Sequence, residues 1–415
     1  MPATDHLPAH SPLGGSAVYR FIPCPGSVGL SAGIDDEEDD TFSKPGTVAH
    51  AVGEQCLDMG LDAWENIGHV VLLRANANPL FIPPASQGPD TPEGVVAIDK
   101  EMADAVQVYL DAIRLAHPDR NQGNFFVERR FHMPSLHKFY YGTADAVYID
   151  EAKRTLHIWD YKHGAGIVVD AEHNEQEMYY AAGVMEDFGL WQEIGTIVLH
   201  IVQPRGWHWA GPVRHWSLTV DELDEWLYET LLPAMDRALT SAETKTGEHC
   251  RFCPARFRHC PALWADIEEL ENLMTQFNLS EKGQAAKLTG EQIARVLDLG
   301  EKFKIAQKAA LATAMQRLEN GATVPGWKLA SKKANREWKE GAEPAARTLF
   351  GKDAYTKPEL KSPAQIEGLP GGEAFVAEHA FKPSTGLTVV KSEDIRPAVS
   401  RDTKSGFTPA KKGKK

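Results

Sequence analysis

Two strand-like segments joined by a short link constrain the fold of this chain more than any other feature of its sequence. The segments ADAVYID, at 144–150, and TLHIWDYK, at 155–162, have the apolar and β-branched content of buried strands, and the link between them suits a hairpin turn. NFFVERRF, before them, predicts a third strand, and TIVLHIVQPR, at 196–205, predicts a buried fourth one. Predicted helices at 98–116 and at roughly 171–188 alternate with these strands. The alternation predicts a mixed α/β layer.

The composition is that of a soluble globular protein. The 415 residues are 42% hydrophobic and 25% charged, which gives enough apolar material for a sizeable core. No stretch approaches the ~20 consecutive apolar residues of a membrane span, and the N-terminus lacks the basic start and apolar run of a secretory signal. We therefore expect a cytoplasmic protein with no membrane partner. The net charge of −14 argues against broad phosphate binding, although a locally basic or metal-neutralised groove would still accept nucleic acid.

Two acidic residues and a lysine lie within the predicted hairpin. Asp160 and Lys162 are two residues apart in one strand and therefore share a face, and Asp145 lies in the neighbouring strand. If the strands pair, both carboxylates can converge on one point, where they repel each other unless a cation lies between them. Oxygen ligands of this kind suit Mg²⁺ or Mn²⁺. The pattern alone equally allows a structural ion pair between Asp160 and Lys162, with Asp145 as an acid beside a turn.

Four short motifs follow one another within residues 46–180: GTVAH, which ends in His50, then GTADAVYID, IWDYK and NEQEMYYAAG. Together they resemble the PD-(D/E)XK nuclease superfamily, and most of all its RecB-like branch, which includes recombination exonucleases and CRISPR-associated adaptation nucleases. The resemblance implies a restriction-endonuclease-like mixed sheet flanked by helices. His50 would lie on a helix that begins at Thr47, and Gln176 and Tyr180 would share one helix face because they are four residues apart.

The resemblance also implies roles for the residues of these motifs. Four groups would hold one Mg²⁺ or Mn²⁺ ion: His50, Asp145, Asp160 and the backbone carbonyl of Tyr161. Lys162 would orient and activate the attacking water, and Gln176 and Tyr180 would brace the site or contact the DNA backbone. Glu54 and Glu128 would support the ligands from behind. The alternatives without a functional role are that His50 is an ordinary helix residue and that Gln176 and Tyr180 only cap and pack. Tyr179 is an alternative to Tyr180 for whichever role that residue has.

Three cysteines are spaced as C-x2-C-x6-C: Cys250, Cys253 and Cys260. In a cytosolic chain such a cluster indicates a metal site, and from spacing alone zinc is the safer prediction, with His249 or His259 nearby as a fourth ligand. The resemblance argues otherwise, because a subset of RecB-like nucleases carries an iron–sulfur cluster. Cys24 lies where the distant fourth ligand is expected, so the resemblance implies a [4Fe–4S] cluster. The remaining cysteine, Cys56, is predicted to be a buried core residue.

Composition divides the chain into four predicted parts. Residues 1–265 carry the nuclease core and the cysteine-ligated cluster, 266–330 form a helical extension with a long helix at 290–319, 331–400 form a small C-terminal module, and 401–415 form a basic, flexible tail. The extension has no counterpart in the best-known RecB-like nucleases. The whole chain resembles instead an uncharacterised phage or prophage family, often thought to serve replication or recombination.

Three functions are open on this reasoning. The first is a metal-dependent DNA nuclease, an exonuclease by expectation, that acts on single-stranded DNA or on free ends, together with a phage recombination or single-strand-binding protein. The second is a non-catalytic DNA-binding or scaffolding protein that keeps the nuclease fold. The third is a zinc-stabilised interaction protein with no role in nucleic-acid chemistry. The intact set of Asp145, Asp160 and Lys162 favours the first.

Overall fold

The computed structural model divides the chain into two compact units, residues 1–291 and 292–415. It describes residues 8, 10–34, 40–74, 77–89, 91–117, 124–208, 210–257, 260–278, 288–331, 337–339, 341–356, 359–363, 366, 369, 371–381, 387–391, 399–402 and 406–409. Each unit has a hydrophobic core of its own.

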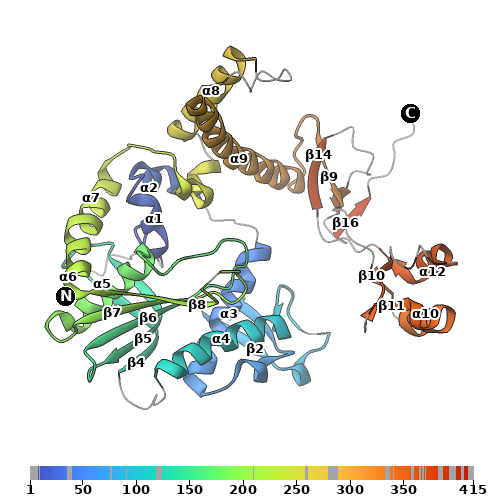
Figure 1. Cartoon of the computed structure of the whole chain (residues 1–415), viewed down its shortest axis with the longest axis horizontal. Helices are drawn as coiled ribbons and strands as arrows, with labels where there is room; N and C mark the ends of the chain where they lie inside the picture. Colours follow the sequence, from blue (N-terminus) through green and yellow to red (C-terminus); the bar gives the residue numbers. More distant parts are fainter. Residues whose placement is uncertain are drawn as a thin grey trace. The chain divides into compact units, whose positions relative to one another are not determined.

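A five-stranded sheet organises the first unit (Figure 1). In spatial order its strands are β4 (Phe125–His132), β5 (Tyr141–Asp150), β6 (Thr155–Tyr161), β7 (Thr196–Val202) and β8 (Val213–Thr219). β6 and β7 run parallel, whereas the other neighbours in this sheet are antiparallel. The predicted hairpin is confirmed, because β5 and β6 pair on either side of the turn at 151–154. The predicted mixed α/β layer is confirmed with it.

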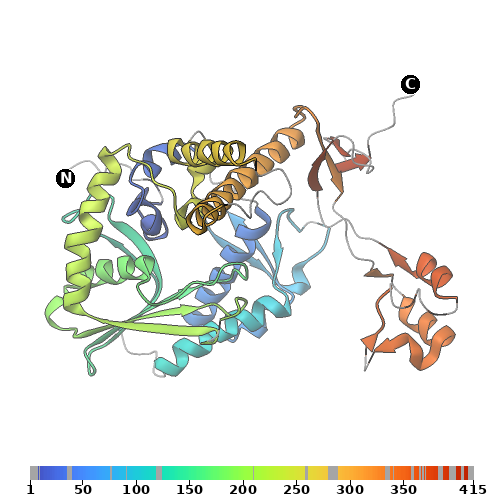
Figure 2. The same ribbon diagram turned by 45° about the horizontal axis from the view of Figure 1, so that its top comes forward.

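Helices cover both faces of this sheet (Figure 2): α5 (Glu175–Phe188) packs on one face, and α3 (Asp40–Met59) and α4 (Lys100–Ala116) pack on the other. Alternate residues of a strand point to opposite faces. Leu156 and Ile158 of β6 therefore lie in the core with α5, and Trp159 and Tyr161 lie in the core with α3 and α4. β6 is buried on both sides, and its end lies inside the molecule.

Local sequence sets the ends of these helices. Asp99 caps α4 and Asn174 caps α5, each through a side-chain oxygen that accepts a hydrogen bond from a backbone amide of the first turn. α3 begins at Asp40, so the predicted start at Thr47 was wrong. Pro45 lies inside the helix, where it removes one backbone hydrogen bond.

Smaller elements complete the first unit. A three-stranded sheet contains β1 (Val70–Arg74), β2 (Ala77–Ile82) and β3 (Val96–Ala97). Short helices are α1 (Val18–Phe21), α2 (Gly26–Ser31), α6 (Val220–Glu225), the π-helix η5 (Trp226–Leu231), α7 (Leu232–Thr240) and α8 (Pro261–Gln276). The 3₁₀ turns are η1 (Gly15–Ala17), η2 (Ala63–Asn66), η3 (Pro84–Ser86), η4 (Leu190–Gln192), η6 (Glu248–Phe252) and η7 (Pro254–Phe257).

The second unit combines short helices with two-stranded sheets. Its elements are α9 (Gly290–Glu319), which begins at the boundary, β9 (Trp327–Ser331), β10 (Glu337–Trp338), α10 (Ala342–Phe350), η9 (Gly351–Ala354), β11 (Tyr355–Thr356), β12 (Glu359–Leu360), α12 (Gly372–His379), β13 (Ala380–Phe381), β14 (Leu387–Lys391), β15 (Val399–Asp402) and β16 (Gly406–Pro409). The predicted tail thus contains part of the β15–β16 hairpin, while residues 410–415 lie outside the described residues. Within the described part of the chain, no helix combines the length and hydrophobicity that a membrane span requires.

Candidate metal centre and catalytic site

Three carboxylates lie side by side across three neighbouring strands. β4 pairs with β5 on both sides of Glu128 and Asp145, so these two residues face each other. The pairing of β5 with β6 ends at Ala146 and Trp159, and the next residues along the two strands are Asp145 and Asp160. Glu128 has a left-handed backbone, with φ 47°, and this conformation interrupts the pairing of β4 at that position. The sheet therefore gathers the acids around Asp145.

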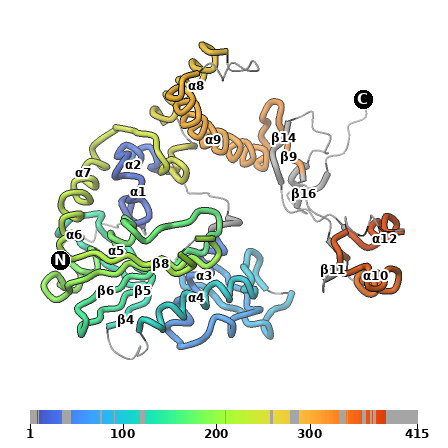
Figure 3. The backbone as a smooth tube through the Cα atoms, viewed as in Figure 1, coloured from blue at the N-terminus to red at the C-terminus, as the bar shows by residue number. Residues whose placement is uncertain are grey.

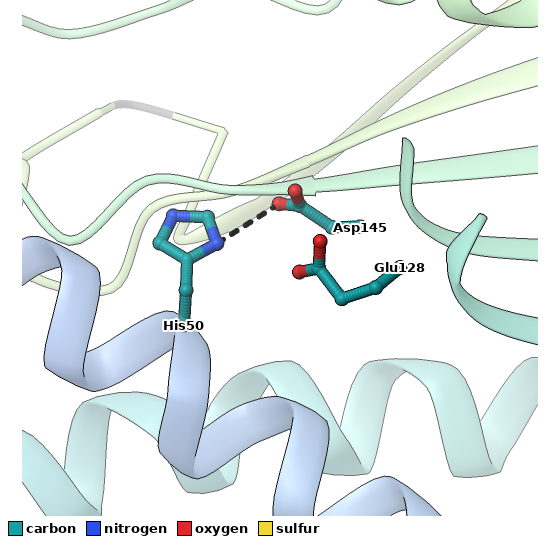
Figure 4. Close-up of side chains that lie close together, drawn as sticks. All are labelled: His50, Glu128 and Asp145. Carbon is teal, nitrogen blue, oxygen red and sulfur yellow. Dashed lines mark ion pairs between the residues drawn. The ribbon is translucent and has the colours of Figure 1, made fainter. Parts of the chain in front are cut away.

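A histidine from α3 joins two of these acids (Figure 4). His50, Glu128 and Asp145 each offer a potential ligand atom, and these atoms all lie within 4.8 Å of one another. His50 Nδ1 is 3.4 Å from Asp145 Oδ2. The predicted meeting of His50 with Asp145 is found, but Glu128, which we expected behind the ligands, completes this compact group. Asp160 has a different set of contacts.

Asp160 lies in a hydrogen-bonded chain with the other predicted catalytic residues. Lys162 Nζ is 2.7 Å from Asp160 Oδ2 and donates to Gln176 Oε1 over 2.9 Å. Gln176 Nε2 contacts Asp160 Oδ1 at 3.3 Å and the Tyr180 hydroxyl at 2.9 Å. Tyr179, the alternative to Tyr180, donates instead to a backbone carbonyl of β5, at Tyr141. The ion pair that the sequence allowed as a purely structural feature is thus present, with the Gln and Tyr of α5 attached to it.

A backbone amide connects the two groups. Tyr161 N donates to Asp145 Oδ2 over 2.8 Å, so the oxygen that faces His50 is held by the strand that carries Asp160 and Lys162. The Tyr161 ring packs edge-on against the His50 ring at 5.4 Å. Asp145 therefore occupies a fixed position between the histidine–glutamate pair and the aspartate–lysine pair.

The electrostatics of the site favour an added cation. Burial, followed by the charges of Asp145 and Glu54, raises the pKa of the Glu128 carboxyl to about 8, although Arg130 acts in the opposite direction. Burial also raises the pKa of Glu54. Crowded carboxylates of this kind become easier to ionise when a positive ion lies among them. Burial disfavours the charge on Lys162, but Asp160 outweighs it and raises the pKa of the amine, which stays protonated.

Sequence reasoning missed a further acid behind this site. Glu177 of α5 is fully buried, and the charges of Asp160 and Lys162 act on it. A signal was available, because Ala181 and Val184 follow Glu177 at helical spacing and all three belong to the buried face of α5. An acid in that apolar stripe departs from the pattern of a surface helix.

The structure brings the four predicted cysteine ligands into one region. Cys24, Cys250 and Cys253 are buried, and Cys24 lies close enough to Cys253 and Cys260 for their charges to act on its thiol. Burial raises the pKa of Cys250 to about 11. Backbone amides approach two of the sulfurs at 3.4 Å, from Lys245 to Cys24 and from Gly247 to Cys250. Figure 3 shows the N-terminal segment beside the segment near residue 250, where α2 contacts α7 and η7.

The histidines near this region and the fifth cysteine are arranged differently. His249 Nε2 lies 2.8 Å from the Lys245 carbonyl oxygen, and His259 lies outside the described residues. Cys56 is fully buried in the core between α3 and the sheet, and Asn66 donates to its sulfur over 3.4 Å. The prediction of Cys56 as a buried core residue is confirmed.

The fold and these side chains define an α/β protein with a candidate metal site of one histidine and neighbouring carboxylates. Residues 10–397 match the family described as "Protein of unknown function (DUF2800)". Because the match spans both units and most of the chain, the protein belongs to this family.

Proposed function

We propose that this protein is a divalent-metal-dependent DNA nuclease of the RecB-like kind, acting as an exonuclease in phage or prophage replication or recombination. The position of Asp145 carries the proposal. Its carboxylate faces His50 and Glu128 on one side and is fixed by the Tyr161 amide, next to Asp160, on the other. Acidic ligands beside a lysine on one edge of a mixed sheet are what the RecB-like resemblance implies.

The residues present fit Mg²⁺ or Mn²⁺. A mostly carboxylate ligand set with one imidazole suits Mn²⁺ and Mg²⁺ better than a soft metal. The raised pKa of Glu128, which comes from burial and from Asp145, indicates a site where burial and crowded negative charge outweigh the nearby Arg130. His50, Asp145 and Glu128 would hold the ion, and Asp160 and the Tyr161 carbonyl are the further ligands that the resemblance implies. Bound there, the ion would polarise the scissile phosphate and stabilise charge on the departing oxygen.

The protein's own residues would position the attacking water. Lys162 is held by Asp160 and by Gln176, so its ammonium group has a fixed place at the end of β6. An ammonium in that position can donate to the water and to a phosphate oxygen and can stabilise negative charge that develops there. Tyr180 fixes Gln176 in turn, so α5 holds the lysine in place through these two side chains.

The proposal is tested by cleavage of end-labelled single- and double-stranded DNA with Mg²⁺ or Mn²⁺. We expect Asp160→Ala and Lys162→Ala to lower the cleavage rate on the order of 10²-fold or more, because each removes part of the charge arrangement at the phosphate. A matched control exists at the opposite end of the same hairpin. There Lys153 pairs with Asp150 at 2.9 Å, and Lys153→Ala should leave cleavage unchanged.

Two outcomes would contradict the proposal. Full activity in both Asp160→Ala and Lys162→Ala, with circular dichroism like that of the wild type, would refute the site assignment. DNA binding without any product on any of the substrates would favour the non-catalytic binding or scaffolding protein instead.

We also propose that the four cysteines hold a [4Fe–4S] cluster. Their proximity and the backbone N–H groups directed at two sulfurs support metal-bound thiolates, since such hydrogen bonds stabilise the charge on sulfur. Four cysteines, one of them far away in the sequence, are what the RecB-like resemblance implies for an iron–sulfur cluster rather than for a single zinc ion.

A further inference from the structure

Two loops leave the sheet at the edge where Lys162 lies. They follow β6 and β7, the parallel pair, and their described residues are 162–174, 203–208 and 210–212. The Lys162 amide donates to the Val202 carbonyl over 2.8 Å, so both loops begin beside the catalytic lysine. The carboxyl ends of parallel strands are a common place for ligand-binding loops, because these strand ends meet at one edge of the sheet.

A buried glutamine fastens the two loops together. Gln203 is 1% exposed, and its amide nitrogen donates to the carbonyls of Gly164, at 2.9 Å, and Ile167, at 2.6 Å. Its amide oxygen accepts from Val169 N and from Arg214 Nη2, both at 3.0 Å. All four hydrogen-bonding positions of this side chain are used. The Gln203 side chain therefore holds the two loops together.

The backbone of Gly206, just before Trp207, lies against the Gln203 side chain. A Cβ atom at Gly206 would lie 2.9 Å from Gln203 Cδ, so only glycine permits this close approach. The residues flanking Trp207 are anchored to the facing loop. Arg205 Nη1 donates to the His163 carbonyl over 3.3 Å, and His208 Nε2 lies 3.1 Å from an oxygen of Asp170.

Apolar side chains on these two loops are exposed to solvent. The Trp207 side chain is 83% exposed, and Ile167 and Val168, on the facing loop, are 37% and 38% exposed. Trp207 is the most exposed of these side chains, and its loop is anchored beside Lys162. A single exposed ring is too small for a stable protein interface, which buries about 800 Å² on each partner, but a nucleobase can stack on it. Arg205, on the same loop, already pairs with Glu101, with its Nη2 2.8 Å from Glu101 Oε1.

We propose that Trp207 is a stacking platform for an unpaired base of the DNA substrate, which makes single-stranded DNA or a frayed end the preferred substrate. The proposal rests on the proposed nuclease function and deepens it. Trp207 lies on the loop that follows Val202, whose carbonyl accepts from the Lys162 amide, so a strand that enters the site can stack a base on the ring. Stacking requires an accessible base face, which a single strand offers and a closed duplex does not.

The test measures binding of a fluorescein-labelled oligothymidylate by fluorescence anisotropy, with Ca²⁺ in place of Mg²⁺. We expect Trp207→Ala to weaken binding roughly 10-fold, within the range of one aromatic–base stack, and Trp207→Phe to retain most of the affinity. Trp64, 49% exposed on η2, provides the matched control, and Trp64→Ala should bind like the wild type. An oligonucleotide without bases should bind equally to the wild type and to Trp207→Ala.

The outcomes separate this proposal from the nuclease proposal. Unchanged oligothymidylate affinity in Trp207→Ala would overturn the stacking platform, and so would an equal loss for duplex and baseless DNA. Either result leaves the roles of Asp160 and Lys162 to the cleavage assay. Failure of the wild type to bind any DNA would instead overturn the proposed function itself.

Discussion

A single buried acid makes the stability of the first unit depend on pH. Burial, together with the charge of Asp160, raises the pKa of Glu177 well above its usual range, although Lys162 acts in the opposite direction. The carboxyl is therefore neutral in the folded protein at pH values where it ionises in the unfolded chain. Stability from this group is complete below the ordinary glutamate pKa of about 4.3 and falls as the pH rises above it.

Replacement of this acid by its neutral isostere should remove that loss. We expect Glu177→Gln to be more stable than the wild type at pH 8, by up to about 1.4 kcal/mol for each pKa unit of the shift, and the difference should shrink toward pH 5. The measurement is the free energy of unfolding in urea at several pH values. Glu172→Gln, at an exposed position just before the same helix, is the control. Stability curves of wild type and Glu177→Gln that stay parallel across this pH range would contradict the prediction.

At the scale of elements, α5 lies very close to the sheet. A Cβ atom at Gly183 would lie 2.2 Å from the Phe131 ring of β4, and that ring is itself packed against Tyr140 and Tyr179. The glycine allows the helix to approach far enough for Gln176, which also contacts Tyr180, to reach Asp160 at the end of β6. Helix position and site geometry are therefore coupled through one small residue.

Alanine at two helical glycines should have opposite effects. Gly183→Ala should destabilise the first unit by about 1–3 kcal/mol through overpacking. Gly300→Ala, in α9, where a Cβ would meet no atom within 4 Å, should stabilise the second unit by about 0.5–1 kcal/mol. Thermal unfolding followed by calorimetry measures both changes. A stabilising effect of Gly183→Ala would show that α5 can move away from the sheet freely.

The sequence predicted the sheet and most of the long helices closely, with an exception at α3. The apolar and β-branched content of 144–150 and 155–162, with the short link between them, led to the observed hairpin. The start of α3 was missed, since Thr47 has the chemistry of a cap but lies inside a longer helix that contains Pro45. Capping residues indicate that a helix can start at a position and not that it must.

The sequence predicted which residues belong to the candidate site, but it predicted their spatial arrangement less well. Motif order placed His50 beside Asp145, and helical spacing placed Gln176 with Tyr180. The place of Glu128 next to them depends on a left-handed backbone that no local sequence pattern indicates for a glutamate. The role of Gln203 was also missed, because its four hydrogen bonds join loops that are far apart in sequence.

At the scale of the whole molecule, the proposed cluster would connect distant parts of the chain. Cys24 follows α1, whereas the other three ligands lie after residue 249, and the backbones already meet where Gly26 N donates to the Glu243 carbonyl over 2.8 Å. A link that closes so long a loop lowers the entropy of the unfolded chain and stabilises the folded one, in the manner of a covalent crosslink. Its loss should therefore affect the entire first unit.

Anaerobic purification tests this connection. We expect a brown protein with visible absorption, and we expect Cys24→Ala to lose the colour and to melt at a lower temperature. Cys56→Ala should keep the colour, because Cys56 lies in the core between α3 and the sheet and not with the other cysteines. A colourless wild type that contains zinc by elemental analysis would contradict the cluster and favour the single-ion site.

The left-handed backbone at Glu128 lowers the stability of the protein, and it also places an acid beside Asp145. A glutamate in a left-handed conformation costs about 1 kcal/mol or more, and its carboxylate is pressed against like charge. Glycine at this position would adopt the same backbone conformation without that cost, but the acid would be lost. In the proposed site a bound divalent cation would relieve this repulsion, so we expect removal of divalent ions to lower both the cleavage activity and the stability of the first unit.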